Sequence, residues 1–193
     1  FAQPFLRKMA RDARGDEEVL IWADSLARVC PREGALVYAA ALQGSGRTAR
    51  ADEILRRVMA AYPLDPNPCE SLGLLRIDLA RWDEAGEAFA EADRRDWRGR
   101  WILFEARCAR EKGDLERASR FYLSEAARRP FQPESLRGLM EVYERSRMPA
   151  EALRAARLWA QTDPLSREAW EAYRRLLGNQ EPETRERISK ILS

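Results

Sequence analysis

The 193-residue sequence contains no histidine, only three lysines and only three cysteines. Without histidine, the commonest general base and the commonest metal ligand are both missing. The glycine-rich phosphate loop, the G-x-S-x-G motif and the H-E-x-x-H motif are absent as well. We therefore expect no catalytic, cofactor-binding or metal-binding residues, and we predict that the chain is not an enzyme.

Other features of the composition narrow the class of partner. No apolar run reaches the roughly 18–20 residues that span a bilayer, so we expect no membrane insertion. The net charge of +2 gives no bulk attraction to nucleic acid, and we expect none as a partner. The sequence begins at Phe1 without a methionine or a leader pattern, so we expect a processed form or a piece of a longer protein.

The cysteines bear on the compartment. Cys30, Cys69 and Cys108 show no C-x-x-C spacing and lie within helical patterns. Buried, reduced cysteine is the usual meaning of such an arrangement. It favours the cytoplasm, with the periplasm as the alternative.

What the sequence does contain is a repeat. Residues 113–130 have the pattern of a helix that Asp114 caps and Pro130 ends. Residues 46–63, 80–97 and 147–164 have the same pattern. A small residue recurs in it at intervals of 34, 33 and 34, at Ala51, Ala85, Ala118 and Ala152. A period of this size is typical of arrays of helix pairs.

The predicted fold is all-α, a right-handed superhelical solenoid of about five to six helix-turn-helix repeats. We expect one domain over residues 1–193, with repeats at about 1–31, 32–63, 64–97, 98–130, 131–164 and 165–193. The last segment includes a capping helix with a narrow apolar stripe of Ile188, Ile191 and Leu192. Core packing is predicted for five tryptophans, and partial exposure for Trp97. The five are Trp22, Trp82, Trp101, Trp159 and Trp170.

With its paired helices, its period and its helix-ending prolines, the chain resembles the tetratricopeptide repeat family. The third copy carries Leu72-Gly73 in its first helix and Ala85, Phe89 and Ala92 in its second. Departures are Trp97 in place of the proline and Glu125 where the family has a small residue. The resemblance implies a protein- or peptide-binding scaffold whose ligand lies along the concave face made by the first helices.

Carried onto this sequence, the resemblance implies nine partner-binding positions. They are Glu70, Leu74, Ile77, Arg100, Leu103, Arg107, Arg110, Arg137 and Glu141. Arg100, Arg107 and Arg110 are predicted to lie mostly on one side of a helix, where they could bind the carboxylates of an acidic segment. The alternative is a solvated face on which these arginines pair with Glu70, Asp78 or Glu141. The family's clamp for carboxylate tails is absent from these positions.

Charge is uneven along the array. Residues 64–97 carry four arginines against nine acidic residues, a net of −5, and residues 98–130 carry nine basic against five acidic residues, a net of +4. Ion pairing between repeats explains this pattern, and so does a groove with two poles.

The predicted function is a scaffold that assembles a larger complex, bacterial by analogy with the family, and self-association is one further mode. One alternative is the non-catalytic arm of a larger enzyme, such as a glycosyltransferase, or of a polysaccharide-export or secretion protein. The other is a helical-repeat RNA reader, which the charge of +2 disfavours.

Overall fold

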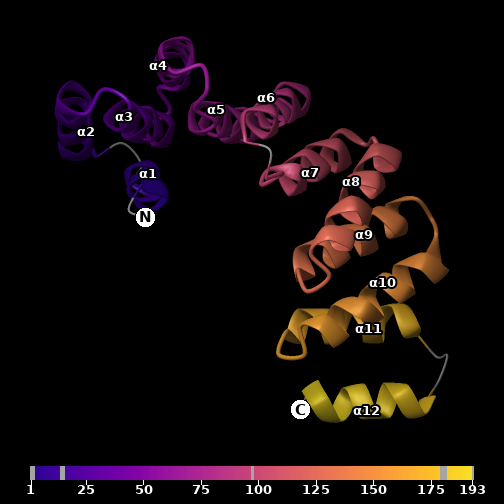
Figure 1. Cartoon of the computed structure of the whole chain (residues 1–193). Coiled ribbons are helices and arrows are strands. Elements are labelled where there is room, and N and C mark those ends of the chain that lie inside the picture. The colour runs from indigo at the N-terminus through magenta and orange to yellow at the C-terminus, as the bar shows by residue number, and fades with distance from the viewer. Residues whose placement is uncertain (1–2, 14–15, 97, 179–181, 193) are drawn as a thin grey trace. The chain divides into compact units, whose positions relative to one another are not determined.

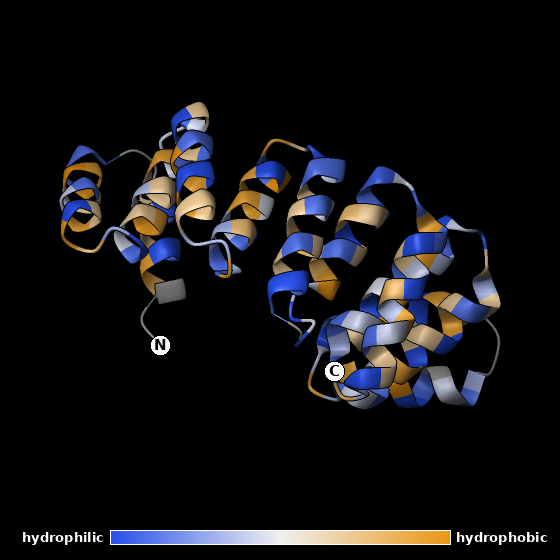
Figure 2. Ribbon diagram, turned by 45° about the horizontal axis from the view of Figure 1, so that its top comes forward, coloured by the Kyte–Doolittle hydropathy of each residue, from blue (hydrophilic) through white to orange (hydrophobic). Residues whose placement is uncertain are grey.

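A computed structural model describes residues 3–13, 16–96, 98–178 and 182–192. These residues form twelve helices and no strand. The chain divides into two compact units, Phe1–Trp101 and Ile102–Ser193. Along the helices, hydrophobic and hydrophilic residues alternate (Figure 2), as expected of helices that bury one side.

Unit 1 contains six helices, most of which pack against the next helix in the chain (Figure 1). Unit 2 contains the other six, and each of them packs against its neighbours in sequence. The helices of unit 1 are α1 (Gln3–Asp12), α2 (Glu17–Val29), α3 (Glu33–Gly44), α4 (Thr48–Ala61), α5 (Asn67–Asp78) and α6 (Trp82–Arg95). Those of unit 2 are α7 (Ile102–Lys112), α8 (Leu115–Arg128), α9 (Pro133–Arg145), α10 (Pro149–Thr162), α11 (Arg167–Leu177) and α12 (Pro182–Leu192).

The repeated small residue has the role that its spacing predicts. Ala51, Ala85, Ala118 and Ala152 lie near the start of α4, α6, α8 and α10, and each is 0% exposed. Complete burial at each of these points leaves little room for a larger side chain, so we infer that a neighbouring helix approaches closely there. The predicted cap of α8 is also confirmed, because the Asp114 carboxylate accepts a hydrogen bond of 3.1 Å from the backbone N–H of Arg117.

The turn inside each helix pair repeats as well. One residue in each turn has a positive φ, at Gly46 (77°), Ala80 (54°), Gly113 (94°) and Arg147 (58°). Glycine adopts this left-handed conformation freely, whereas a residue with a Cβ atom is strained in it. Each unit therefore has one relaxed turn and one strained turn of the same geometry.

The first helix departs from the predicted pairing of residues 1–31. Instead of forming a hairpin with α2, α1 packs against α3, on the side of α3 opposite to α4 (Figure 1). Because α1 does not cover α2, the outer side of α2 leaves Trp22 46% exposed and Val29 79% exposed. The prediction that Trp22 fills the core is therefore wrong.

The other predicted core and cap residues have mixed outcomes. Trp101 and Trp159 are buried, while Trp82 and Trp170 are half-buried. Trp97 lies outside the described residues. In the capping helix α12, Ile188 is buried in the core of unit 2 and Ile191 remains 53% exposed.

The cysteines are free, as their spacing predicts. Cys69 and Cys108 are buried and Cys30 is partly exposed. Burial raises the pKa of the Cys69 thiol, and it raises that of Cys108 to about 11. Both buried thiols are therefore protonated and unreactive at neutral pH.

Candidate partner-binding surface

The nine predicted partner-binding residues are divided between the two units. We call the surface formed by α3 and α5 the first-helix face of unit 1, and that formed by α7, α9 and α11 the first-helix face of unit 2. Glu70, Leu74 and Ile77 lie on α5, and Arg100 follows α6. Leu103, Arg107 and Arg110 lie on α7, and Arg137 and Glu141 lie on α9.

In unit 1, α1 covers part of the first-helix face. The guanidinium of Arg7 donates hydrogen bonds of 3.2 Å to the Glu70 carboxylate and 3.0 Å to the Ser71 hydroxyl. Leu6 packs into the core of unit 1, and Ala10 is 2% exposed. Glu70, one of the predicted binding residues, is thus already bound by a residue of the same chain.

The backbone of α1 comes very close to the end of α3. A Cβ atom added to Gly44 would lie 2.0 Å from the carbonyl oxygen of Arg11. Only glycine at position 44, which has no side chain, therefore allows α1 to lie this close to α3.

A cleft of about 140 Å³ remains between α1 and the first-helix face. It is lined in part by Ala40, Gln43 and Leu74.

The position of Arg100 corrects one prediction. Helix α7 begins at Ile102, so Arg100 is not on one helix side with Arg107 and Arg110. Its Nε lies 2.7 Å from the Asp96 carboxylate, and its guanidinium lies 4.5 Å from the centroid of the Trp101 ring. Within unit 1, Arg100 holds the end of the chain segment that follows α6.

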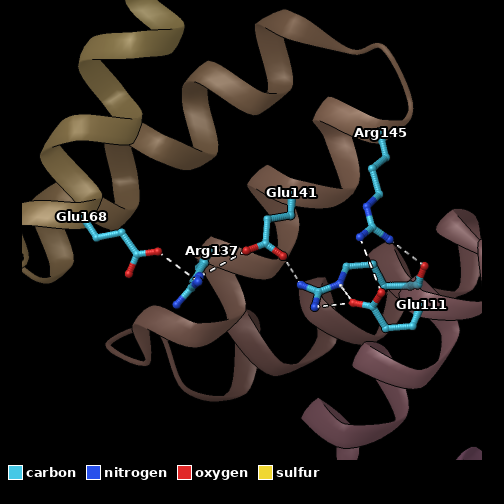
Figure 3. Close-up of polar contacts among 6 residues, drawn as sticks. Glu111, Arg137, Glu141, Arg145 and Glu168 are labelled. Atoms are coloured by element: carbon cyan, nitrogen blue, oxygen red, sulfur yellow. Dashed lines mark hydrogen bonds and ion pairs between the residues drawn. The ribbon is translucent and has the colours of Figure 1, made fainter. Parts of the chain in front are cut away.

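In unit 2, ion pairs cross the first-helix face from helix to helix (Figure 3). Arg110 on α7 pairs with Glu141 on α9, and it also donates a 2.8 Å hydrogen bond to Glu111. Arg145 on α9 lies 3.5 Å from Glu111 and donates a 3.0 Å hydrogen bond to the Arg110 carbonyl. The sequence alternative in which Arg110 pairs with Glu141 is the one that the structure has.

The same pattern continues to the next helix. Arg137 on α9 lies 3.1 Å from Glu141 and 2.9 Å from Glu168 on α11. Arg175 on α11 donates two hydrogen bonds, of 2.6 and 3.0 Å, to the Glu144 carboxylate on α9. We call this set the ion-pair ladder of unit 2. Its members are Arg110, Glu111, Arg137, Glu141, Glu144, Arg145, Glu168 and Arg175.

The electrostatics of the ladder follow from partial burial and charge. The Arg110 side chain is only 14% exposed. Burial of Glu111 favours its neutral form, but the hydrogen bond and charge of Arg110 outweigh that effect and lower the pKa of Glu111. The buried end of the ladder is therefore charged on both sides at neutral pH.

Sequence reasoning missed the extent of this ladder, although the signal is present. Opposite charges stand 31 residues apart at Arg110/Glu141 and at Glu144/Arg175. In the ladder, that interval joins a residue on one first helix to a residue on the next. Among the described residues, Arg107 has no ion pair, and its side chain is exposed on α7.

Two findings concern other kinds of site. Among the residues that the structure describes, no group of three or more Cys, Asp or Glu could hold a metal ion. No described helix is both long enough and apolar enough to cross a membrane.

Comparison with known proteins reveals similar folds. No protein-family model matches the chain, and no curated protein sequence matches it. Among solved structures, PilF of Pseudomonas aeruginosa is similar at a TM-score of 0.70 and 17% identity, over 96% of this chain and 90% of PilF. A double mutant of MamA RS-1 is similar at a TM-score of 0.68 and 12% identity, over 88% of this chain and 92% of that one.

A further MamA structure, residues 41 to the end from Desulfovibrio magneticus RS-1, has a TM-score of 0.62 and 13% identity over 92% of each chain. PilF and MamA are both tetratricopeptide-repeat proteins. The chain therefore has the tetratricopeptide-repeat fold that its sequence resembles.

Proposed function

We propose that the chain is a protein-binding scaffold that holds peptide or helical segments of its partners on its first-helix faces and so assembles a larger complex. The observation that carries this proposal is the position of α1. The first-helix face of unit 1 already binds a helix, through Arg7 on Glu70 and through the buried Ala10. A surface that accepts a helix from its own chain has the shape and chemistry to accept one from a partner.

In unit 2, the proposed contact centres on α7. Leu103 and Arg107 are one helical turn apart, Leu103 is partly exposed, and Arg107 has no ion pair among the described residues. Arg110, by contrast, is held by Glu111 and Glu141. We therefore assign recognition of an acidic partner segment to Arg107, and the ordering of the surface around it to Arg110, Arg137 and Glu141.

The fold suits this role. Helix-pair arrays expose a long surface whose side chains are free to vary, because the packing depends on small residues elsewhere. The similar structures of MamA and PilF share this fold, and the proposal rests on the surface of this chain.

Site-specific photo-crosslinking tests the proposal. A crosslinking amino acid is placed at Arg107, on the first-helix face of unit 2, and in a matched variant at Arg120 on α8, whose side chain is 70% exposed. We expect discrete protein adducts in cells of the source organism at position 107 and not at position 120. Adducts that are the same at both positions, or found only at position 120, would contradict the use of the first-helix face.

A further inference from the structure

The helix that occupies unit 1 has a definite chemical character. Leu6 and Ala10, four residues apart, face the core of unit 1, while Phe5 is 64% exposed and Met9 is 55% exposed on the other side. Its charged residues are three basic and one acidic, namely Arg7, Lys8, Arg11 and Asp12. The segment is thus a short basic helix with apolar residues at helical spacing.

The surface beneath α1 complements this character. Glu70 and Ser71 supply acceptors for one guanidinium. The small residues Ala39 and Ala40 line the cleft, and Gly44 lets a helix backbone approach closely. The first-helix face of unit 1 therefore selects for a helix with a basic residue directly after an apolar one.

The hydrogen bonding of α1 to the first-helix face is incomplete, so a helix that bonds more completely could compete with α1 for this surface. The Arg7 side chain is only 12% exposed, and its Nε has no hydrogen-bond partner among the described residues. A buried donor without a partner lowers the net gain from binding. Helix α1 has only ten residues, and its packing is with α3, since it makes few contacts with α2.

We propose that the first-helix face of unit 1 is the binding site, here called the seat, of a basic amphipathic helix of a partner protein. In the absence of the partner, α1 occupies this site, and the partner helix displaces it. This inference rests on the proposed function and names the partner chemistry for one of its two surfaces. Recognition is by charge and by small-residue packing, with Glu70 as the anchor. A partner helix that satisfies every donor of its arginine outcompetes α1.

The test uses a fluorescent synthetic peptide, FAQPFLRKMARDA, as the basic helix and measures its anisotropy with the full chain. In the Ala10→Asp chain a buried charge replaces a methyl group, so α1 leaves its seat while Glu70 is unchanged. We expect this chain to bind the peptide about tenfold more tightly than the wild type, because α1 no longer competes. Adding Glu70→Arg should abolish the gain, and a peptide carrying Arg7→Glu should recover part of it on the Glu70→Arg chain.

The matched control is Ala49→Asp, at an exposed alanine on α4, and it should bind the peptide as the wild type does. Trypsin cleavage after Arg7 and Lys8 reports whether α1 has been released. If Ala10→Asp releases α1 without tightening peptide binding, the proposal is wrong. If neither Ala10→Asp nor Leu6→Asp/Ala10→Asp releases α1, then α1 is a fixed part of the fold, and this too overturns the proposal.

Light scattering tests whether the helix on this face comes from a second copy of the chain. A wild-type chain that is a dimer, and that Ala10→Asp converts to a monomer, would assign the seat to α1 of a second copy and overturn the proposal. The crosslinking experiment at Arg107 reports on unit 2 alone. The proposed function and this inference can therefore fail separately.

Discussion

The two units use the same face of the same repeat in different ways. In unit 1, the first helices α3 and α5 carry α1, which Arg7 anchors to Glu70 and Ser71. In unit 2, the first helices α7, α9 and α11 are joined directly by the ion-pair ladder. The face of unit 1 binds a further helix, whereas the helices that form the face of unit 2 are linked to one another by ion pairs.

This difference shows which residues set the fold and which are free to set the function. The small residues of the second helices, such as Ala85 in unit 1 and Ala152 in unit 2, are 0% exposed in both units. The first-helix positions vary from an apolar or acidic residue in unit 1 to a paired arginine in unit 2. A repeat of this kind keeps its packing positions constant and leaves its face available for different contacts.

The largest expected effect concerns what the two units share. Ala85→Leu and Ala152→Leu should each overpack a close helix crossing and lower the free energy of unfolding by about 1–3 kcal/mol. Chemical denaturation of the full chain measures both, with Ala49→Leu at an exposed position as the control. Unchanged midpoints for both buried variants would mean that the repeat register, with these alanines at the helix crossings, is wrong.

The next expected effect is a pH-dependent change in stability that arises in unit 1 alone. In unit 1, the Asp65 side chain is 4% exposed, lies 2.8 Å from the Nε of Arg32 and accepts a hydrogen bond from the backbone N–H of Asn67. Burial alone would raise the pKa of Asp65, but the hydrogen bonds from Arg32 and Asn67 outweigh it and lower the pKa below its usual value. Its stabilising contribution is present above about pH 4 and is lost as the pH falls below that value.

Asp65→Asn should therefore destabilise the chain by about 1–2 kcal/mol at pH 7 and have a smaller effect near pH 3. Urea denaturation at the two pH values measures the difference. Glu53→Gln, at an exposed carboxylate on α4, is the control. An equal effect of Asp65→Asn at both pH values would show that Asp65 stabilises by packing alone.

An effect of similar size tests the ladder of unit 2. Glu141→Gln removes the negative charge that pairs with Arg110, whose side chain is largely buried. Glu144→Gln removes the negative charge that pairs with Arg175, whose side chain is 59% exposed. We expect a loss of about 1–2 kcal/mol for Glu141→Gln and less than about 0.5 kcal/mol for Glu144→Gln. Thermal unfolding in low and high salt measures both. The reverse order would place the tightly held part of the ladder at α11 instead of α7.

The last expected effect is a gain in stability. Ala80→Gly in unit 1 and Arg147→Gly in unit 2 relieve a left-handed turn and should each stabilise the chain by about 0.5–1 kcal/mol. The reverse change at an already relaxed turn, Gly113→Ala, should destabilise the chain by a similar amount. Melting temperatures that do not differ between the Gly variants and the wild type would argue against strain at these two turns.

The sequence predicts the second helices better than the first helices. Ala118 could be identified because a small residue recurs there with the period, and the cap at Asp114 because a cap is a local feature of the sequence. The position of α1 could not, because Arg7 meets Glu70 across 63 residues of sequence and no repeat relates the two. Helical spacing also suggested Trp22 as core, since nothing in the sequence shows that α1 leaves the outer side of α2 uncovered.

The candidate site was predicted in part. The first-helix positions Glu70 and Arg110 were identified from the family pattern, yet both are engaged within the chain, Glu70 by Arg7 and Arg110 by Glu141. Charge alone cannot tell a binding arginine from a structural one, because both occupy the same face. The 31-residue interval between opposite charges is the signal that separates Arg110 from Arg107, which has no ion pair with any described residue.

Amide hydrogen exchange of α1 tests the central claim most directly, namely that the first-helix face of unit 1 binds a helix through Glu70. The amides of residues 6–12 are followed in the wild-type chain and in Glu70→Arg, with those of α9 as the internal reference. We expect protection of α1 in the wild type, its loss in Glu70→Arg, and no change in α9. Exchange of α1 at unprotected rates in the wild type, or protection that Glu70→Arg leaves unaltered, would contradict the claim.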